Sequence, residues 1–419
     1  MTLKISVIGL GYVGLPLFVE LSKKFNTVGF DLNKDRIQAL QESKDLNNEV
    51  SEDALIELKN RFTFDGSDID NSDVFIVATP TPVDNDNQPD LAILISATKS
   101  VATKLQKGNL VIFESTVFPG CTEEICVPIL EEISGLRYID DFGCGYSPER
   151  INPGDTKHTI RNVNKIVSAS NDQYLELAFS IYTAVVDAQV YKAPNIKTAE
   201  AAKIIENIQR DVNIALVNEW AILFKKLNID TNEVLKAAGT KWNFLDFKPG
   251  LVGGHCIGVD PYYLEFKAKQ IGMDTKMLSS GRAINDYMPQ YIAEEIFDLI
   301  KSCSINIKDI KCTILGFTFK ENCPDVRNTK VYDLYNLLKK EISSIAVFDP
   351  MADKATVKDI YNLNLADEID FSSTNLLILA VGHDAFHSKK GLNTFVDSKK
   401  ALLVDLKNFY PSELSHWRL

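Results

Sequence analysis

A glycine-rich segment near the start of the chain, residues 9–14 (GLGYVG), most limits the folds that this sequence can adopt. It follows an apolar run over residues 4–8 that predicts a β-strand, and it precedes a stretch with helical periodicity. In this context Gly9 permits a tight turn, Gly11 lets the backbone approach a pyrophosphate, and Gly14 lets helix and strand pack closely. The segment therefore predicts an α/β domain that binds a dinucleotide.

An acidic residue at the end of the next predicted strand indicates which dinucleotide is bound. Asp31 follows a strand predicted over residues 27–30 and lies 20 residues beyond Gly11. A carboxylate at this place accepts a hydrogen bond from the ribose 2′-hydroxyl and repels a 2′-phosphate. The sequence therefore favours NAD over NADP.

The rest of the chain divides into three stretches of different character. The first 190 residues alternate short apolar strands with helices, including buried strands over 74–78 and 110–113, which is typical of a parallel sheet. Over residues 198–227 apolar side chains recur at spacings of three and four without Pro or Gly, which predicts one helix about 45 Å long. A helix of this length links domains or packs against its copy in a dimer.

Beyond residue 305 the opening pattern returns. Apolar segments over 311–316, 346–349, 375–381 and 402–405 repeat the order of the first strands, although their sequences differ. We therefore predict an α/β protein with two doubly wound, Rossmann-like domains joined by a long central helical region. In the second domain Lys320 stands after the first strand, at the place where the first domain has its glycine loop. This lysine either supplies a positive charge for a phosphate ligand or is an ordinary solvated lysine.

A second glycine-rich segment, residues 248–262, predicts a shaped loop that carries a reactive thiol. It holds Cys256 together with His255 and Asp260. Backbone N–H groups and a nearby cation would lower the pKa of the thiol and make it a nucleophile, while a buried small cysteine is the alternative. A metal site is disfavoured, because no second His or Cys stands at ligand spacing.

Lys203 and Asn207 are four residues apart on the predicted long helix and so share one face. They interrupt its apolar stripe, which indicates either a functional pair or a solvated face with an interhelical hydrogen bond.

Charge and cysteine usage exclude several classes of protein. The chain has 45 Lys and Arg against 57 Asp and Glu, a net charge of −12, without the basic stripe of a nucleic-acid-binding protein. No apolar run approaches the ~18 residues that span a membrane, and the N-terminus does not resemble a signal peptide. The seven cysteines form no C-x-x-C pair, which predicts reduced thiols and a cytoplasmic location.

Seven motifs along nearly the whole chain resemble those of the UDP-glucose/GDP-mannose dehydrogenase family, most closely its branch acting on UDP-N-acetylhexosamines. The motifs are Gly9-Leu-Gly-Tyr-Val-Gly-Leu-Pro16, Thr79-Pro-Thr-Pro82, Glu114-Ser-Thr-Val117, Ser147-Pro-Glu-Arg150, Ala199-Glu-Ala-Ala-Lys-Ile-Ile-Glu-Asn207, Gly253-Gly-His-Cys-Ile-Gly-Val-Asp260 and Phe319-Lys-Glu-Asn-Cys-Pro-Asp-Val-Arg327. The resemblance implies an NAD-binding domain over 1–190, a central helical dimerisation domain over 191–300 with the cysteine loop, and a UDP-sugar-binding domain over 301–419. It also implies a homodimer through the central helix.

The resemblance also implies roles for individual residues. The catalytic residues that it implies are Cys256 as nucleophile, Lys203, Asn207 and Asp260 as its neighbours, Glu149 as acid or base, and Thr116, which helps to hold a catalytic water. The substrate-binding residues are Glu149, Lys203, Asn207, Gly253, His255 and Lys320. The cofactor-binding residues are Gly9, Gly11, Tyr12, Val13, Gly14, Asp31, Arg36, Thr81, Thr116 and Arg327.

The chemistry implied by the resemblance is a four-electron oxidation of a sugar C6 alcohol to a carboxylate, with two NAD per sugar and a thioester on Cys256, for surface polysaccharide precursors. His255, Val259 and Asn328-Thr329 replace residue types usual in enzymes acting on UDP-glucose. We therefore expect UDP-N-acetylglucosamine to be favoured and UDP-N-acetylgalactosamine to come next, with UDP-glucose or UDP-N-acetylmannosamine as alternatives. Two other classes stay open: a two-electron NAD dehydrogenase of a hydroxy acid or sugar phosphate, and a catalytically silent NAD- or UDP-sugar-sensing module.

Overall fold

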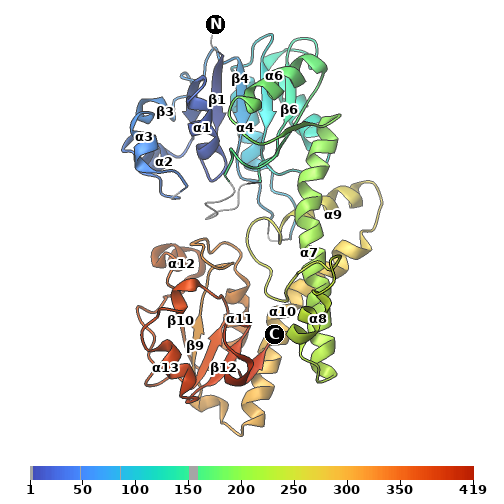
Figure 1. The fold of residues 1–419 in the computed structure, drawn as a ribbon. Helices are drawn as coiled ribbons and strands as arrows, with labels where there is room; N and C mark the ends of the chain where they lie inside the picture. The colour runs from blue at the N-terminus through green and yellow to red at the C-terminus, as the bar shows by residue number, and fades with distance from the viewer. Residues whose placement is uncertain (1–2, 48, 85, 151–158) are drawn as a thin grey trace. The chain divides into compact units, whose positions relative to one another are not determined.

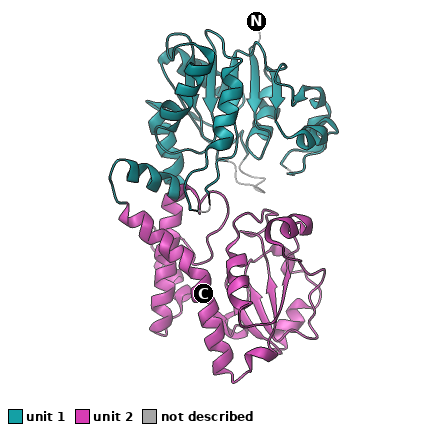
Figure 2. Cartoon of the chain, turned by 180° about the vertical axis from the view of Figure 1, so that it is seen from behind, with its two compact units in different colours: residues 1–206, 262–274 teal, residues 207–261, 275–419 magenta. Residues whose placement is uncertain are grey.

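The computed structural model describes residues 3–47, 49–84, 86–150 and 159–419 of the 419-residue chain. It divides into two compact units, which Figure 2 colours separately. Unit 1 comprises residues 1–206 and 262–274, and unit 2 comprises residues 207–261 and 275–419. Each unit is described by itself below.

Unit 1 is built on one eight-stranded sheet with the strand order β3-β2-β1-β4-β5-β6-β7-β8 (Figure 1). Its strands are β1 (Lys4–Ile8), β2 (Asn26–Phe30), β3 (Phe62–Thr63), β4 (Val74–Val77), β5 (Leu110–Phe113), β6 (Gly143–Tyr146), β7 (Lys165–Ala169) and β8 (Val190–Lys192). The sheet reverses its order on either side of β1 and β4, as in doubly wound folds. This confirms the predicted fold of the first 190 residues.

One pair of strands departs from the predicted parallel sheet. β7 runs antiparallel to β6, with Gly145 opposite Ala169 and Tyr146 opposite Ser168. The apolar character of a buried strand is the same in either direction, so the sequence pattern could not reveal the reversal.

Helices cover the sheet of unit 1 and bury its apolar strands. They are α1 (Gly14–Ser22), α2 (Lys34–Gln41), α3 (Glu52–Ile56), α4 (Ala92–Ala102), α5 (Val127–Ser134) and α6 (Asp172–Thr183). All four residues of β4 and of β5 are buried. The core therefore lies within the sheet and its helices, and leaves the loops after the strands for a site.

The long helix expected over residues 198–227 is confirmed as α7, which spans Ile196–Lys226. It is followed by α8 (Thr231–Ala238), α9 (Asp260–Gln270) and α10 (Lys276–Ser302). The cysteine loop lies between α8 and α9 and contains no strand or helix before Asp260, as its glycines predict.

Unit 2 contains a second doubly wound sheet, which is parallel throughout and has the order β10-β9-β11-β12-β13. Its elements are β9 (Lys311–Leu315), α11 (Lys330–Leu338), β10 (Ser344–Phe348), α12 (Lys354–Tyr361), β11 (Leu376–Leu379), α13 (Leu392–Asp397), β12 (Leu402–Asp405) and β13 (Trp417–Arg418). The predicted repeat of the fold is therefore confirmed.

The turn after the first strand shows how closely the two sheets correspond. Gly9 has φ +93°, and a Cβ there would lie 2.8 Å from the carbonyl oxygen of Ala78 after β4. Gly316 has φ +88°, and a Cβ there would lie 2.8 Å from the backbone of Val381 after β11. Both positions require glycine for the same two reasons: the backbone has a positive φ there, and the segment that follows the neighbouring strand leaves no room for a Cβ.

Among the helices of the described residues, none combines the length and the apolar character needed to cross a membrane.

Candidate active site

The glycine loop of unit 1 has the geometry of a phosphate-binding turn. A Cβ on Gly14 would lie 1.9 Å from the carbonyl oxygen of Gly9, so only glycine lets α1 begin this close to the turn. A Cβ on Gly11 would meet no heavy atom within 4 Å, so the backbone there borders open space. Tyr12 and Val13 lead from Gly11 into the helix, with Val13 at its N-cap position. The backbone N–H groups of this helix start suit a pyrophosphate.

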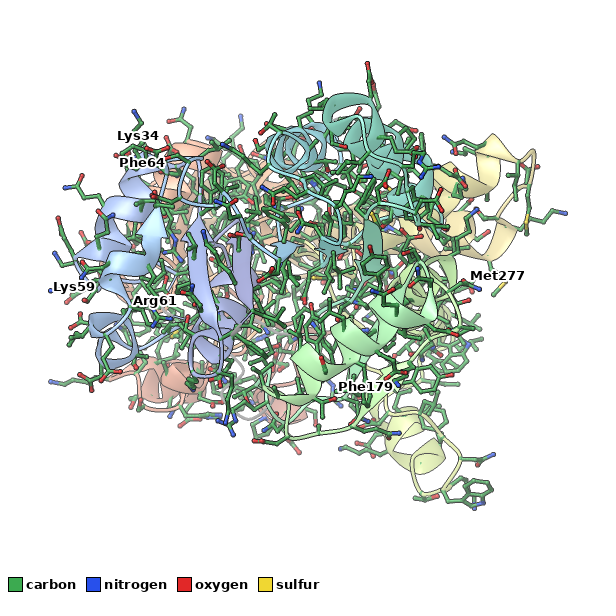
Figure 3. All side chains as sticks on the ribbon, turned by 90° about the horizontal axis from the view of Figure 1, so that it is seen from above. Lys34, Lys59, Arg61, Phe64, Phe179 and Met277 are labelled. Carbon is green, nitrogen blue, oxygen red and sulfur yellow. The ribbon has the colours of Figure 1, made fainter. Side chains whose placement is uncertain are left out.

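Asp31 and Arg36 support this loop from β2 and α2. Asp31 accepts a hydrogen bond at Oδ2 from the backbone N–H of Leu10, at 2.9 Å. Arg36 is buried, donates from Nε to the carbonyl oxygen of Leu10 at 3.0 Å and pairs through Nη1 with Asp45 at 2.7 Å. Beside them, the ammonium of Lys34 lies 5.3 Å from the ring centre of Phe64 (Figure 3).

One atom of Arg36 fits the predicted cofactor. Its Nη2 is buried and has no hydrogen-bond partner among the described residues. A buried guanidinium N–H without an acceptor is costly, and a bound anionic or hydroxyl-bearing ligand would supply one. The open space at Gly11, the helix start at Gly14 and this atom together fit NAD, with Asp31 available for the ribose.

The loops that follow β4 and β5 hold each other at the same edge of the sheet. Thr81 donates from Oγ1 to the carbonyl oxygen of Thr116 at 2.6 Å, and Ser115 donates to that of Thr79 at 2.7 Å. Tyr263 of α9 donates its hydroxyl to the carbonyl oxygen of Thr81 at 2.9 Å. The structure thus brings the predicted residues Thr81 and Thr116 together.

The carboxylate of Asp31 leads to a testable preference. We expect the dissociation constant for NADP to exceed that for NAD by about a hundredfold, because a 2′-phosphate would face this carboxylate. Isothermal titration calorimetry without sugar measures both constants. Asp31→Gly should reduce the ratio of the NADP dissociation constant to the NAD dissociation constant. Asp35→Asn changes an exposed acid in the first turn of α2 and should leave this ratio unchanged. Equal affinities in the unsubstituted protein would contradict the prediction.

Glu149 lies in a buried ionic cluster that the sequence analysis did not identify. Its Oε2 accepts a hydrogen bond from Nζ of Lys165 in β7 at 2.6 Å, and the same Nζ lies 2.9 Å from Oε2 of Glu114. Tyr182 of α6 donates its hydroxyl to the other oxygen of Glu114. Glu114 belongs to one of the family motifs, but Lys165 and Tyr182 lie in ordinary apolar segments, so no local pattern marks them.

In unit 2, three of the predicted catalytic residues come together around the cysteine loop. Asn207 of α7 donates from Nδ2 to Oδ2 of Asp260 at 2.5 Å, and both side chains are buried. The backbone N–H of Asp260 donates to the carbonyl oxygen of Cys256 at 2.9 Å. Lys203 belongs to unit 1, one helical turn before Asn207 on α7, and is also buried.

His255 forms a polar cluster with Asp325 and Arg327. Its Nδ1 lies 3.4 Å from Oδ2 of Asp325 and 3.1 Å from Nη2 of Arg327, which is itself 2.6 Å from that Asp325 oxygen. Burial lowers the pKa of His255, but hydrogen bonds to Asp325 and to the side chain of Cys256 outweigh burial and raise it to about 9. The same contacts hold the pKa of the Asp325 carboxyl well below its usual range despite burial.

This cluster brings together two residues for which different roles were expected. His255 was expected among the substrate contacts and Arg327 among the cofactor contacts, and the structure places both beside Asp325. A protonated imidazole next to Cys256 stabilises the thiolate form of that cysteine. The histidine ring also meets Phe319 edge-on at 6.3 Å, and Gly254, with φ +82°, leaves the space that this phenylalanine fills.

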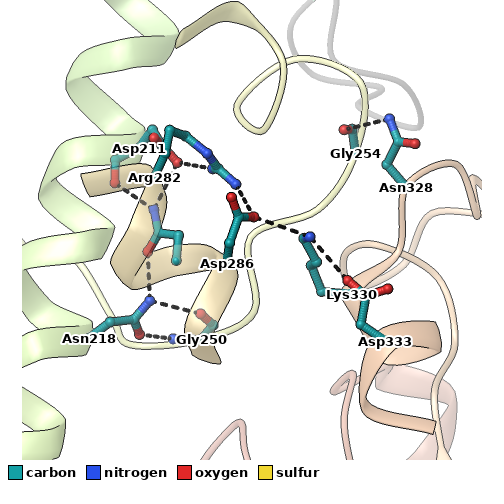
Figure 4. A network of polar contacts seen from close by, with 10 residues as sticks. Asp211, Asn218, Gly250, Gly254, Arg282, Asp286, Asn328, Lys330 and Asp333 are labelled. Carbon is teal, nitrogen blue, oxygen red and sulfur yellow. Dashed lines mark hydrogen bonds and ion pairs between the residues drawn. The ribbon is translucent and has the colours of Figure 1, made fainter. Parts of the chain in front are cut away.

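A cationic cavity in unit 2 contains Gly253 and Lys320, two of the predicted substrate residues. It is lined by Leu251, Gly253, Thr318, Phe319, Lys320, Glu321, Thr329, Lys330, Val331, Ala380, Val381 and Lys407. Lys330 is held by Asp286 at 3.2 Å and Asp333 at 3.0 Å (Figure 4). Lys407 forms an ion pair with Glu321, which also lines the cavity, and sequence analysis identified only Lys320 among the three lysines.

A buried polar network fixes the start of the cysteine loop. Asn218 of α7 exchanges two hydrogen bonds with Gly250, of 2.8 and 3.0 Å, and Arg282 of α10 pairs with Asp211 and Asp286 at 2.6 Å each (Figure 4). Isolated polar residues on long helices give no sequence signal for such a role.

Comparison with known proteins places these features in a family. The chain matches the three domain models of the UDP-glucose/GDP-mannose dehydrogenase family, namely the NAD binding domain over residues 3–186, the central domain over 197–287 and the UDP binding domain over 313–412.

Individual relatives match over the whole chain. It is 49% identical to UDP-N-acetyl-D-glucosamine 6-dehydrogenase of Salmonella typhi, over 99% of this chain and 98% of the relative. It is 46% identical to the enzyme of the same name from Pseudomonas aeruginosa, over 100% of this chain and 99% of the relative. The structure of UDP-D-ManNAc dehydrogenase from Pyrococcus horikoshii superposes with a TM-score of 0.88 at 28% identity, over 98% of this chain and 96% of that one.

Proposed function

Because the chain belongs to the UDP-glucose/GDP-mannose dehydrogenase family of NAD-dependent oxidoreductases, we propose that it is a UDP-sugar 6-dehydrogenase whose substrate is UDP-N-acetylglucosamine. It would oxidise the C6 hydroxymethyl group to the carboxylate. The choice of this sugar rests on one observation: the chain is 49% and 46% identical, over nearly its full length, to two enzymes named for this substrate. Relatives named for UDP-N-acetyl-D-mannosamine are more distant, at 29% and 32% identity.

Unit 2 supplies the covalent part of the proposed reaction. The Cys256 thiolate adds to the C6 aldehyde and forms a thiohemiacetal, and loss of a hydride from that carbon leaves a thioester that water cleaves. His255 holds the sulfur as a thiolate through the hydrogen bond noted above. Asn207 and Asp260, joined at 2.5 Å, are assigned to the sugar oxygen and to the water.

Unit 1 supplies the redox and proton-transfer part. NAD bound at the glycine loop of residues 9–14 would supply the hydride acceptor for the two oxidation steps. Glu149 is assigned as the base that takes protons from the C6 hydroxyl and from the hydrolytic water, and Thr116 helps to hold that water. Lys203, buried on α7, is assigned to the oxyanion.

The cationic cavity of unit 2 is assigned to the diphosphate of the substrate, with Lys320, Lys330 and Lys407 as its cations. This assignment agrees with the match of residues 313–412 to a UDP binding domain.

We further propose a cytoplasmic homodimer formed through α7, where Ile205, Leu216 and Leu223 are 54%, 41% and 49% exposed. Its product would enter the synthesis of surface polysaccharides.

A substrate panel with product counting tests the proposed function. We expect UDP-N-acetylglucosamine to give the highest kcat/KM and UDP-N-acetylgalactosamine the next, with UDP-N-acetylmannosamine and UDP-glucose slower. For UDP-glucose the reason is that a pocket shaped for a 2-acetamido group leaves polar groups unpaired around its 2-hydroxyl. Absorbance at the NADH band, calibrated against sugar consumed, should give two NADH per sugar. A ratio of one would exclude the thioester route, and fastest oxidation of UDP-glucose would overturn the substrate assignment.

A further inference from the structure

The ionic cluster around Glu149 holds one cation between two carboxylates. Lys165 Nζ lies 2.6 Å from Glu149 and 2.9 Å from Glu114, and all three side chains are at most 3% exposed. The groups that face it come from four elements: Glu114 at the end of β5, Glu149 after β6, Lys165 in β7 and Tyr182 in α6. The ammonium also lies 5.1 Å from the ring centre of Tyr182.

The charges of this cluster do not cancel when every acid is ionised. Among the residues that the structure describes, two carboxylates and one ammonium leave a net charge of −1 at this buried site, which is unfavourable unless one proton is added. Burial raises the pKa of Glu114 to about 7, although Lys165 lowers it, and burial raises that of Tyr182 well above its ordinary value. Tyr182 therefore stays a neutral donor, and Glu114 is the acid that gains the proton near neutral pH.

Hydrogen bonds fix the orientation of Glu149 within the cluster. Its Oε1 accepts from the backbone N–H of Arg150 at 2.7 Å, while Oε2 is held by Lys165. Because each oxygen of the carboxylate is held by a fixed donor, the carboxylate keeps one orientation. A general base requires such a fixed orientation.

We propose that Lys165 is a positioning residue for Glu149, and that Glu114 and Glu149 share one exchangeable proton across its ammonium. In the exchange Lys165 passes a proton to the Glu149 carboxylate and takes one from the Glu114 carboxyl group, so it remains an ammonium. With the proton on Glu114, Glu149 is the base, and with the proton on Glu149, it is the acid. This inference rests on the proposed function, in which Glu149 transfers protons.

Two variants with opposite expected effects test the proposal. Glu114→Gln removes the competing carboxylate, so Lys165 pairs with Glu149 alone and the acidic limb of the kcat/KM profile should move to lower pH by about one unit. Lys165→Met leaves two carboxylates without a cation, so the acidic limb should move to higher pH by about one unit or more. Lys165→Arg keeps the charge and should restore the original profile. Lys192→Met is the control, because Lys192 of β8 forms a more exposed ion pair with Glu176 of α6, and it should leave the profile unchanged.

A measurement without sugar separates this proposal from the proposed function. Infrared difference titration of the whole protein with NAD should show a buried carboxylic acid that ionises near pH 7 and is absent in Glu114→Gln. If no UDP-sugar is oxidised, the proposed function fails and the infrared titration still tests the shared proton. An unchanged acidic limb in folded Glu114→Gln, or no such carboxyl band in the unsubstituted protein, would overturn the proposal.

Discussion

Replacement of Cys256 by serine should lower kcat by at least about a thousandfold while NAD and the UDP-sugar still bind. A serine hydroxyl is far less acidic than a thiol, so the imidazole of His255 cannot hold it as an alkoxide. The Cys256 carbonyl oxygen accepts hydrogen bonds from the backbone N–H groups of Val259 and Asp260, and a serine at this position can keep both bonds. The loop should therefore keep its shape, and the loss should fall on chemistry.

Steady-state rates and calorimetry on one preparation separate these effects. Cys303→Ser is the matched control, because Cys303 is exposed and lies at the end of α10, outside the cysteine loop. Retention of more than about a tenth of the activity in Cys256→Ser would remove this residue from the mechanism. His255→Gln should give a smaller loss that recovers as pH rises, because an unassisted thiol then ionises.

The second large effect is expected at the glycine loop. Gly11→Ala should leave the free protein as stable as before, because the added Cβ meets nothing within 4 Å and Gly11 has no positive φ. It should weaken NAD binding by about tenfold to a hundredfold, because the methyl group occupies the space that the pyrophosphate needs. Thermal unfolding with and without NAD measures both effects.

Gly14→Ala distinguishes a ligand effect from a folding effect. Its Cβ would lie 1.9 Å from the backbone oxygen of Gly9, so this variant should lose stability even without cofactor. Gly66 also borders open space but lies outside the glycine loop of residues 9–14. Gly66→Ala should therefore change neither the stability of the free protein nor its affinity for NAD. Unaltered NAD affinity in Gly11→Ala would show that the cofactor does not approach this part of the backbone.

The fold was predictable because its signals are local. Strands such as Lys4–Ile8, Leu110–Phe113 and Leu402–Asp405 are short apolar runs next to turns, and α7 is marked by its long apolar periodicity. The direction of β7 was not predictable, since burial on both faces makes parallel and antiparallel strands look alike.

For the candidate site, residues within motifs could be named but their partners could not. Cys256, Asn207 and Asp260 were expected together; the structure joins the side chains of Asn207 and Asp260, and it joins Cys256 to Asp260 through the backbone. Lys165 was missed because a lysine in an apolar strand is informative only once Glu114 and Glu149 are seen beside it. Asp325 stands inside the motif of residues 319–327, but no spacing rule could predict its pairing with His255, which lies 70 residues away in the sequence.

The glycine turn shared by the two sheets separates two kinds of evolutionary constraint. Gly9 and Gly316 are both required by the neighbouring strand, whether or not a nucleotide binds there. Selection for the architecture alone would therefore retain the first glycine in a domain that had lost its dinucleotide. Gly14 is likewise required by the backbone of Gly9, so only Gly11, which borders open space and has no glycine counterpart after Gly316, records selection for the cofactor. Whether such a domain in a homologue binds the cofactor should accordingly be judged from the position of Gly11, and not from the glycine of the turn.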